Sequence, residues 1–333
     1  MTGDLLLQVR NLQTHFFTAS GVVKAVDGVS FDLERGKTLG IVGESGSGKS
    51  VTSNSIMRLL PKNGRIVGGE ILFAGKDLAA LGEKDMLKIR GQDISMIFQD
   101  PMTSLDPVFK IGAQVMEVLQ AHRKISNAEA WREAVEALKM VGIPEAEKRM
   151  NSYPHEFSGG MRQRVFIAMA VACRPRLVIA DEPTTALDVT VQAQVLDLLV
   201  ELQREMGTSI ILVTHNLGVV WSLCDTVMVM YAGKTVEYAT TRALYQKPLH
   251  PYTWGLLNSM PKLSDDAGKP LASIPGTPPD LKLTSRNCNF HNRCIYCRDI
   301  CKEQAPPLLE LEPGHFAACH FQRPGSRLQR KVD

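Results

Sequence analysis

The sequence lacks the features of a secreted or membrane-spanning chain. Its N-terminus has no basic segment followed by an apolar one, as a signal peptide requires. No stretch approaches the ~20 apolar residues that span a bilayer, and the longest apolar runs, such as Ile210–Val213, have the length of a strand. We therefore expect a soluble, cytoplasmic chain unless another protein holds it at a membrane.

The sequence also has little excess charge. Lys and Arg number 38 against 35 Asp and Glu, and a net charge of +3 does not by itself indicate nucleic-acid binding. A chain with 44% hydrophobic and 22% charged residues is not disordered, collagen-like or coiled-coil. Because single cores stop growing at roughly 250–300 residues, the 333 residues predict a second unit.

The seven cysteines are unevenly distributed. Cys173 and Cys224 stand alone in apolar surroundings, whereas the other five follow residue 287. An odd number of cysteines in a chain without a secretion signal argues against a disulfide framework and favours a metal site. The clustered residues are Cys288, Cys294, Cys297, Cys301 and Cys319.

The spacing of apolar residues predicts an α/β fold. Short β-like runs fill the first 75 residues, and a helical pattern follows over 111–141, with a capping box at Ser126 and Glu129. Beyond residue 165, all-apolar strands alternate with a helix, which is typical of a parallel sheet covered on both faces. The expected strands are Leu5–Val9, Val22–Val26, Val29–Leu33, Thr38–Val42, Glu70–Phe73, Leu177–Ala180, Ser209–Val213 and a hairpin of Thr226–Tyr231 with Thr235–Glu237, with turns at Asp27-Gly28, Arg35-Gly36, Ala74-Gly75 and Ala232-Gly233.

Proline becomes frequent near residue 247. The prolines from Pro248 onward interrupt any regular element, so we expect a loop-rich extension that builds little core. The predicted division is a main domain over 1–246 and an extension over 247–333.

A glycine-rich loop follows the expected strand Thr38–Val42. Its sequence matches the phosphate-loop pattern G-x-x-x-x-G-K-[ST] and precedes a helix-compatible run. Glycines let backbone N–H groups turn towards phosphates, and a helix N-terminus adds partial positive charge. Lys49 is expected to meet the β- and γ-phosphates of a nucleotide, and the Ser50 hydroxyl to ligate Mg²⁺. The loop comprises Gly43, Glu44, Ser45, Gly46, Ser47, Gly48, Lys49 and Ser50.

Two further segments carry candidate chemistry. The apolar run Leu177–Ala180 delivers Asp181 and Glu182 at its carboxyl end, where open α/β sheets bind ligands. Asp181 can hold Mg²⁺ through water, and Glu182 can accept a proton from the water that attacks the γ-phosphate. About 20 residues earlier, Ser158, Gly159 and Gly160 open a helix-compatible run that can bind an anion.

This order of motifs resembles the ATP-binding subunit of an ABC transporter over about residues 1–245. The resemblance implies a P-loop NTPase fold with a mainly parallel sheet, an N-terminal antiparallel β-subdomain and a helical signature subdomain over about 100–170. It implies that two cassettes pair head to tail, so that the signature around Ser158 closes over the phosphate loop of the other. The other residues implied are Gln99 as a Mg²⁺ and permease contact, Asp188 in the D-loop, His215 as the switch histidine and Phe16 as the adenine-stacking aromatic.

Two positions depart from the common pattern of that family. Met161 stands where the signature usually has Gln, and Asn216 follows His215 where Asp is usual. The second departure bears on the tuning of the switch.

The extension resembles that of oligopeptide/dipeptide-permease ATPases. His250-Pro251-Tyr252-Thr253 and Ile274-Pro275-Gly276 carry the likeness together with the cysteines. Spacing alone leaves zinc and an iron–sulfur cluster open, since both use four thiolates. The resemblance implies a [4Fe–4S] cluster on Cys288, Cys294, Cys301 and Cys319, with Cys297 as an extra thiol.

The resulting hypothesis is a peripheral ATPase at the cytoplasmic face of the inner membrane, which drives oligopeptide import. The implied partners are a second, distinct ATPase subunit, two transmembrane permeases and an extracytoplasmic peptide-binding protein, without nucleic acid. The alternatives are dipeptide or nickel import by the same mechanism, a non-transport ABC ATPase that acts on DNA or ribosomes, and an iron–sulfur sensor.

Overall fold

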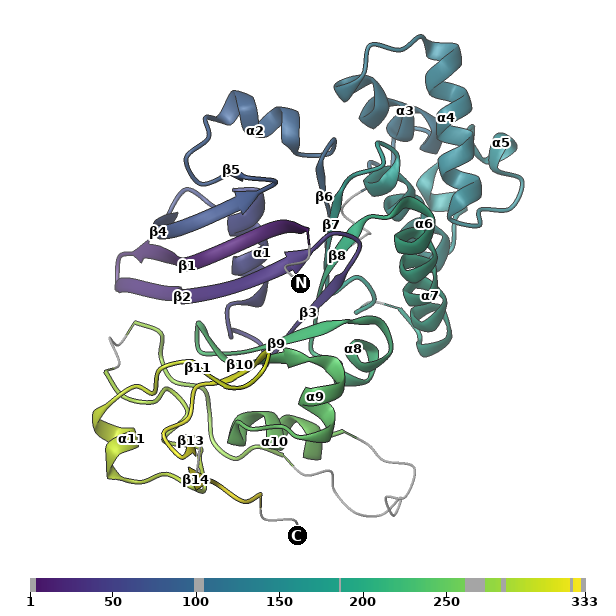
Figure 1. Ribbon diagram of the computed structural model, residues 1–333. Coiled ribbons are helices and arrows are strands. Elements are labelled where there is room, and N and C mark those ends of the chain that lie inside the picture. The colour runs from purple at the N-terminus through teal and green to yellow at the C-terminus, as the bar shows by residue number, and fades with distance from the viewer. Residues whose placement is uncertain are drawn as a thin grey trace. The chain divides into compact units, whose positions relative to one another are not determined.

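The computed structural model describes residues 4–98, 105–185, 187–260, 273–282, 286–323 and 326–330 (Figure 1). The chain forms two compact units. The helical unit comprises residues 1–6, 33–37 and 80–212, and the phosphate-loop unit comprises residues 7–32, 38–79 and 213–333.

An antiparallel sheet in the phosphate-loop unit has the strand order β2-β1-β4-β5. Its strands are β1 (Leu5–Thr18), β2 (Gly21–Glu34), β4 (Gly64–Phe73) and β5 (Lys76–Asp77). The turn predicted at Asp27-Gly28 is wrong, because β2 continues through it. Gly28 takes φ +86°, which a residue without Cβ adopts at little steric cost, so the glycine does not end the strand.

The second sheet of this unit contains strands in the order β11-β12-β10-β9-β3. All five residues of β3 (Thr38–Val42) are buried, and β3 pairs in parallel with β9 (Thr226–Tyr231). The predicted hairpin is confirmed, since β10 (Lys234–Thr240) returns antiparallel to β9. Before residue 247, the helices of the phosphate-loop unit are α1 (Lys49–Met57), α8 (Leu217–Leu223) and α9 (Thr241–Gln246).

The helical unit contains strands in the order β8-β7-β6, and β6 pairs in parallel with β7. The predicted capping residue is confirmed, because Ser126 Oγ accepts a hydrogen bond from Glu129 N at the start of α4. Among the described residues, no helix combines the length and apolar character needed to cross a membrane. The elements are β6 (Ile94–Ile97), β7 (Leu177–Asp181), β8 (Ser209–Thr214), α2 (Glu83–Ile89), α3 (Ile111–His122), α4 (Asn127–Met140), α5 (Ala146–Arg149), the 3-10 turn η1 (Pro154–Glu156), α6 (Gly159–Val171) and α7 (Val189–Met206).

The extension is more ordered than the proline count predicted. It adds β12 to the edge of β10, and it buries the side chains of Tyr252, Trp254 and Phe290. The expectation of a loop-rich extension with little core is therefore wrong. Pro251 is the first residue of a helix, a position at which the missing proline N–H breaks no hydrogen bond, so proline does not prevent the element from forming. These elements are α10 (Pro251–Asn258), α11 (Asp299–Glu303), β11 (Leu309–Glu312), β12 (His315–Ala317), β13 (Gln322–Arg323) and β14 (Ser326–Arg327).

Candidate nucleotide-binding site

The phosphate loop connects β3 to α1 through three left-handed glycines. Gly43, Gly46 and Gly48 take φ values of +153°, +77° and +103°. A Cβ at Gly43 would lie 2.2 Å from Met230 O, and one at Gly48 would lie 2.4 Å from Ala25 O. The loop is therefore packed against neighbouring backbone at both ends and requires glycine at these two positions.

Lys49 begins α1 and folds back over the loop. Its ammonium nitrogen Nζ donates to Gly43 O (2.9 Å) and Glu44 O (3.0 Å), and the residue is 5% exposed. Ser47 is also buried, and its hydroxyl has no hydrogen-bond partner among the described residues. A buried cation, a spare hydroxyl and a helix N-terminus at one loop form a site that suits polyphosphate.

Glu44 is held by two residues of the extension. Its backbone N–H donates to Tyr252 Oη (2.9 Å), and its carboxylate accepts hydrogen bonds from Arg293 Nη1 (2.6 Å) and Nη2 (2.9 Å). The Glu44 carboxylate raises the pKa of the Arg293 guanidinium above its usual value. The sequence did not reveal these contacts, because Tyr252 and Arg293 lie 208 and 249 residues from Glu44.

The acidic pair lies at the end of β7 in the helical unit. Asp181 is the last residue of this fully buried strand and is 6% exposed. Glu182 follows with a left-handed φ of +47°, and its Oε2 accepts a hydrogen bond from Thr185 Oγ1 (2.9 Å). A left-handed φ is uncommon for a residue with a Cβ, so the backbone leaves the extended conformation of β7 at Glu182.

The signature and the D-loop residue both cap helices of the helical unit. Ser158 Oγ accepts a hydrogen bond from Met161 N (3.3 Å) at the start of α6, and Asp188 Oδ1 accepts one from Val191 N (2.9 Å) at the start of α7. A Cβ at Gly160 would lie 2.6 Å from Val191 Cγ1, whereas Gly159 has open space around it. These contacts bring the two predicted segments together.

The other residues predicted to contact the nucleotide lie outside the loops and helix starts described so far. His215 is exposed directly after β8, and Asn216 caps α8 by accepting from Gly218 N (3.0 Å). Asn is as good an N-cap as Asp, so this departure from the family pattern preserves the helix start. Phe16 is half-buried on β1, beside the more exposed Phe17. Gln99 lies outside the described residues.

Four cysteines of the extension line one cavity of about 20 Å³, namely Cys288, Cys294, Cys301 and Cys319. Burial raises the pKa of Cys288 to about 11 and that of Cys294 to about 12, so these thiols lose their protons at neutral pH only beside a bound cation. Within the part of the chain that the structure describes, no three His, Cys, Asp or Glu side chains are arranged to hold a single metal ion.

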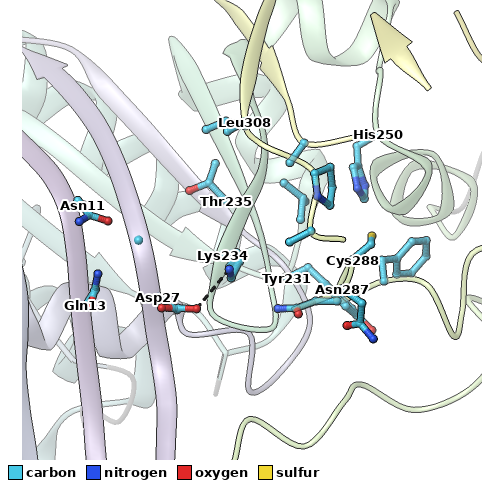
Figure 2. Close-up of a pocket in the computed structure, with 17 residues that line it drawn as sticks. Asn11, Gln13, Asp27, Tyr231, Lys234, Thr235, His250, Asn287, Cys288 and Leu308 are labelled. Atoms are coloured by element: carbon cyan, nitrogen blue, oxygen red, sulfur yellow. Dashed lines mark ion pairs between the residues drawn. The ribbon is translucent and has the colours of Figure 1, made fainter. Parts of the chain in front are cut away.

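A larger cavity, of about 310 Å³, lies between β1, β2, the β9–β10 hairpin and the extension (Figure 2). Figure 2 shows Asn11, Gln13 and Asp27 on one side and His250 and Cys288 on the other, with the ion pair of Asp27 and Lys234 (3.2 Å) between them. Its described lining includes no residue of the phosphate loop, and the cavity is therefore distinct from that loop.

Comparison with known proteins defines the class. Residues 26–185, which include the phosphate loop, the signature and the acidic strand, match the family described as ABC transporter. The chain has a TM-score of 0.64 and 28% identity to the ATP-binding cassette MJ0796, solved as a dimer in a post-hydrolysis state with ADP and Pi, over 71% of this chain and 99% of that one. It has the same score and 29% identity to CbiO1 of Clostridium perfringens, part of the CbiONQ ABC transporter complex, over 73% and 92%. The protein is an ABC-type ATPase, as the motifs predicted.

The extension and the curated relatives define the branch of this class. Residues 236–301 match the family described as the C-terminal region of oligopeptide/dipeptide transporters. The chain is 55% identical to the oligopeptide transport ATP-binding protein OppD of Escherichia coli, over 95% of this chain and 93% of that one. It is 52% identical to the dipeptide transport ATP-binding protein DppD of Lactococcus lactis, over 95% and 91%. The chain belongs to the family of oligopeptide/dipeptide ABC transporter ATP-binding proteins.

Proposed function

We propose that this chain hydrolyses ATP to drive the uptake of oligopeptides through partner permeases. The observation that carries the proposal is the phosphate loop, in which the buried Lys49 ammonium donates hydrogen bonds to two carbonyl oxygens of the loop. The chain that contains this loop is 55% identical to an oligopeptide transport ATP-binding protein. Dipeptide uptake is the second candidate, because a relative named for dipeptide transport is 52% identical over the same share of this chain.

Each nucleotide residue has a proposed role. Lys49 binds the β- and γ-phosphates, Ser50 and Asp181 hold Mg²⁺ with Gln99, and Glu182 accepts the proton of the attacking water. His215 contacts the γ-phosphate, and Phe16 stacks on adenine. Mg²⁺ supplies neutralisation of the charge that develops on the transferred phosphoryl group. The burial of Asp181 and the left-handed backbone at Glu182 support two different roles for these carboxylates.

A pair of cassettes is part of the proposal. Ser158, Gly160 and Asp188 would complete the nucleotide site of a second, distinct ATPase subunit. The exposed Ser158 at the N-terminus of α6 supports this role, since such a terminus binds anions, and a similar cassette has been solved as a dimer. The other proposed partners are two transmembrane permeases and an extracytoplasmic peptide-binding protein, which place the chain at the cytoplasmic face of the inner membrane.

The extension is proposed to hold a [4Fe–4S] cluster on Cys288, Cys294, Cys301 and Cys319, with zinc as the alternative. The support is that these four thiols line one cavity, whereas the Cys297 thiol donates to the adjacent Arg298 carbonyl (3.6 Å). We place the domain boundary at residue 247, with an ABC domain over 1–246 and the extension over 247–333, and a cluster would link segments within the extension.

The test compares ATP binding and turnover in the assembled transporter. Glu182→Gln should bind MgATP normally and lose at least about 100-fold in turnover, because the general base is removed. Glu201→Gln, on the exposed face of α7, should behave like the wild type. Retained turnover in Glu182→Gln would contradict the assignment of the base, and uptake of dipeptides in preference to longer peptides would favour the second candidate.

A further inference from the structure

All three polar groups of Glu44 are engaged, and two of them contact the extension. The N–H donates to Tyr252 and the carboxylate accepts from Arg293, while the carbonyl oxygen accepts from Lys49 Nζ (3.0 Å) and Ser47 N (3.2 Å). A displacement of Glu44 would therefore also displace one of the two acceptors of Lys49 Nζ. The extension thus contacts the phosphate loop at one of the two residues whose carbonyl oxygens bind Lys49.

Arg293 is fixed in one orientation by the use of all five of its N–H groups. Two bind Glu44, and the others donate to Pro275 O (2.9 Å), Ile274 O (3.2 Å) and Tyr231 Oη (3.3 Å). The side chain is 4% exposed, so water does not replace these contacts. In this bidentate pair the guanidinium is buried and the Glu44 side chain is 28% exposed, so Arg293 cannot move away from Glu44 without leaving its own charge buried and unpaired.

Tyr252 is fixed in a similar way by aromatic packing. Its ring centroid lies 4.6 Å from that of Tyr231 and 5.4 Å from that of Phe290. Phe290 precedes Arg293 in the cysteine-rich segment, and Arg293 N donates to Phe290 O (3.0 Å). The hydroxyl and the guanidinium that bind Glu44 therefore depend on the same segment of the extension.

The charge of Glu44 needs a partner when the loop binds ATP. A carboxylate inside a phosphate loop repels the phosphates unless a cation neutralises it, and Arg293 supplies that cation. The loss of Arg293 should therefore weaken ATP binding both by freeing the loop and by exposing the phosphates to a negative charge.

We propose that Arg293 and Tyr252 are positioning residues for ATP binding, through which the extension sets the ATP affinity of the phosphate loop. The proposal rests on the proposed function only in requiring that this loop binds ATP. Any change in the cysteine-rich segment 288–301 that withdraws Arg293 from Glu44 lowers this affinity.

The experiment is MgATP titration of the full-length chain and its variants. Arg293→Gln should weaken ATP binding about tenfold, within the range of coupling between sites. Adding Glu44→Gln to this variant should restore most of the affinity, because the unpaired carboxylate is removed. A purely structural role for Arg293 predicts no such rescue. Tyr252→Phe preserves the packing of this ring against Tyr231 and Phe290 but removes the hydroxyl that accepts from Glu44 N, and it should weaken ATP binding about fivefold.

The matched control is Arg298→Gln in the same segment. Its guanidinium lies 4.6 Å from the Phe321 ring centroid, away from the loop, and the variant should bind ATP like the wild type. Binding by Arg293→Gln within twofold of the wild type, or a double variant weaker than the single one, would overturn the proposal. Lys49→Ala separates the two proposals, because normal binding in that variant would overturn the ATP assignment of the loop itself.

Discussion

The buried carboxylate of Glu237 should hold the extension against strand β10. This residue of β10 is fully buried, and its oxygens accept hydrogen bonds from Leu249 N (2.7 Å), His250 N (2.8 Å) and His315 Nε2 (2.8 Å). Glu237→Ala leaves three buried donors without an acceptor, each of which costs about 1–3 kcal/mol. With partial relaxation we expect about 3–5 kcal/mol of destabilisation, as for the loss of one partner in other buried polar pairs.

Urea unfolding together with limited proteolysis would measure this effect. The midpoint should fall, and cleavage within the extension should become faster while the helical unit resists. Glu312→Ala is the matched control, because Glu312 is paired with Lys247 and Arg327 at a partly exposed position and should cost less than about 1 kcal/mol. The reasoning is refuted if Glu237→Ala costs no more than Glu312→Ala.

Three further predictions concern the loop, a buried histidine and the thiols. Gly48→Ala should reduce MgATP affinity more than tenfold in a nucleotide titration, whereas Gly46→Ala, which has open space for a Cβ, should have the smaller effect; equal losses would contradict the packing argument. Burial lowers the pKa of His250 to about 3 in the folded chain, so below pH ~6.5 the unfolded chain binds this proton preferentially. The free energy of unfolding should therefore fall by up to about 1.4 kcal/mol for each unit by which the pH drops below ~6.5. His250→Asn retains a capping side chain and should lack this part of the pH dependence in urea unfolding at pH 7, 6 and 5; identical slopes would argue against it. Anaerobically purified Cys294→Ser should lose its iron and sulfide while Cys297→Ser keeps them, and zinc without iron in the wild type would replace the cluster.

Local chemistry made much of the fold predictable. The strand Thr38–Val42 and the strand Thr226–Tyr231 have the predicted bounds, because each is an apolar run bounded by glycine or polar turn residues. Ser126 caps its helix and Gly207 ends α7 in the left-handed conformation, as their residue types require. The errors arose where tertiary pairing overrides a local signal, as in β2 across Gly28 and in the extension, where β12 pairs with β10.

The sequence by itself determined the class of protein. The phosphate loop, the acidic pair and the signature are contiguous motifs, since each needs particular residues at consecutive backbone positions around phosphate or metal. Only the tertiary structure decided how the extension meets the loop. The phosphate-loop pattern leaves the residue at position 44 unspecified, and the partners of Glu44, Tyr252 and Arg293, come from more than 200 residues away. Contacts of that kind produce no periodic or local pattern in the sequence, because they join residues that become neighbours only when the chain folds.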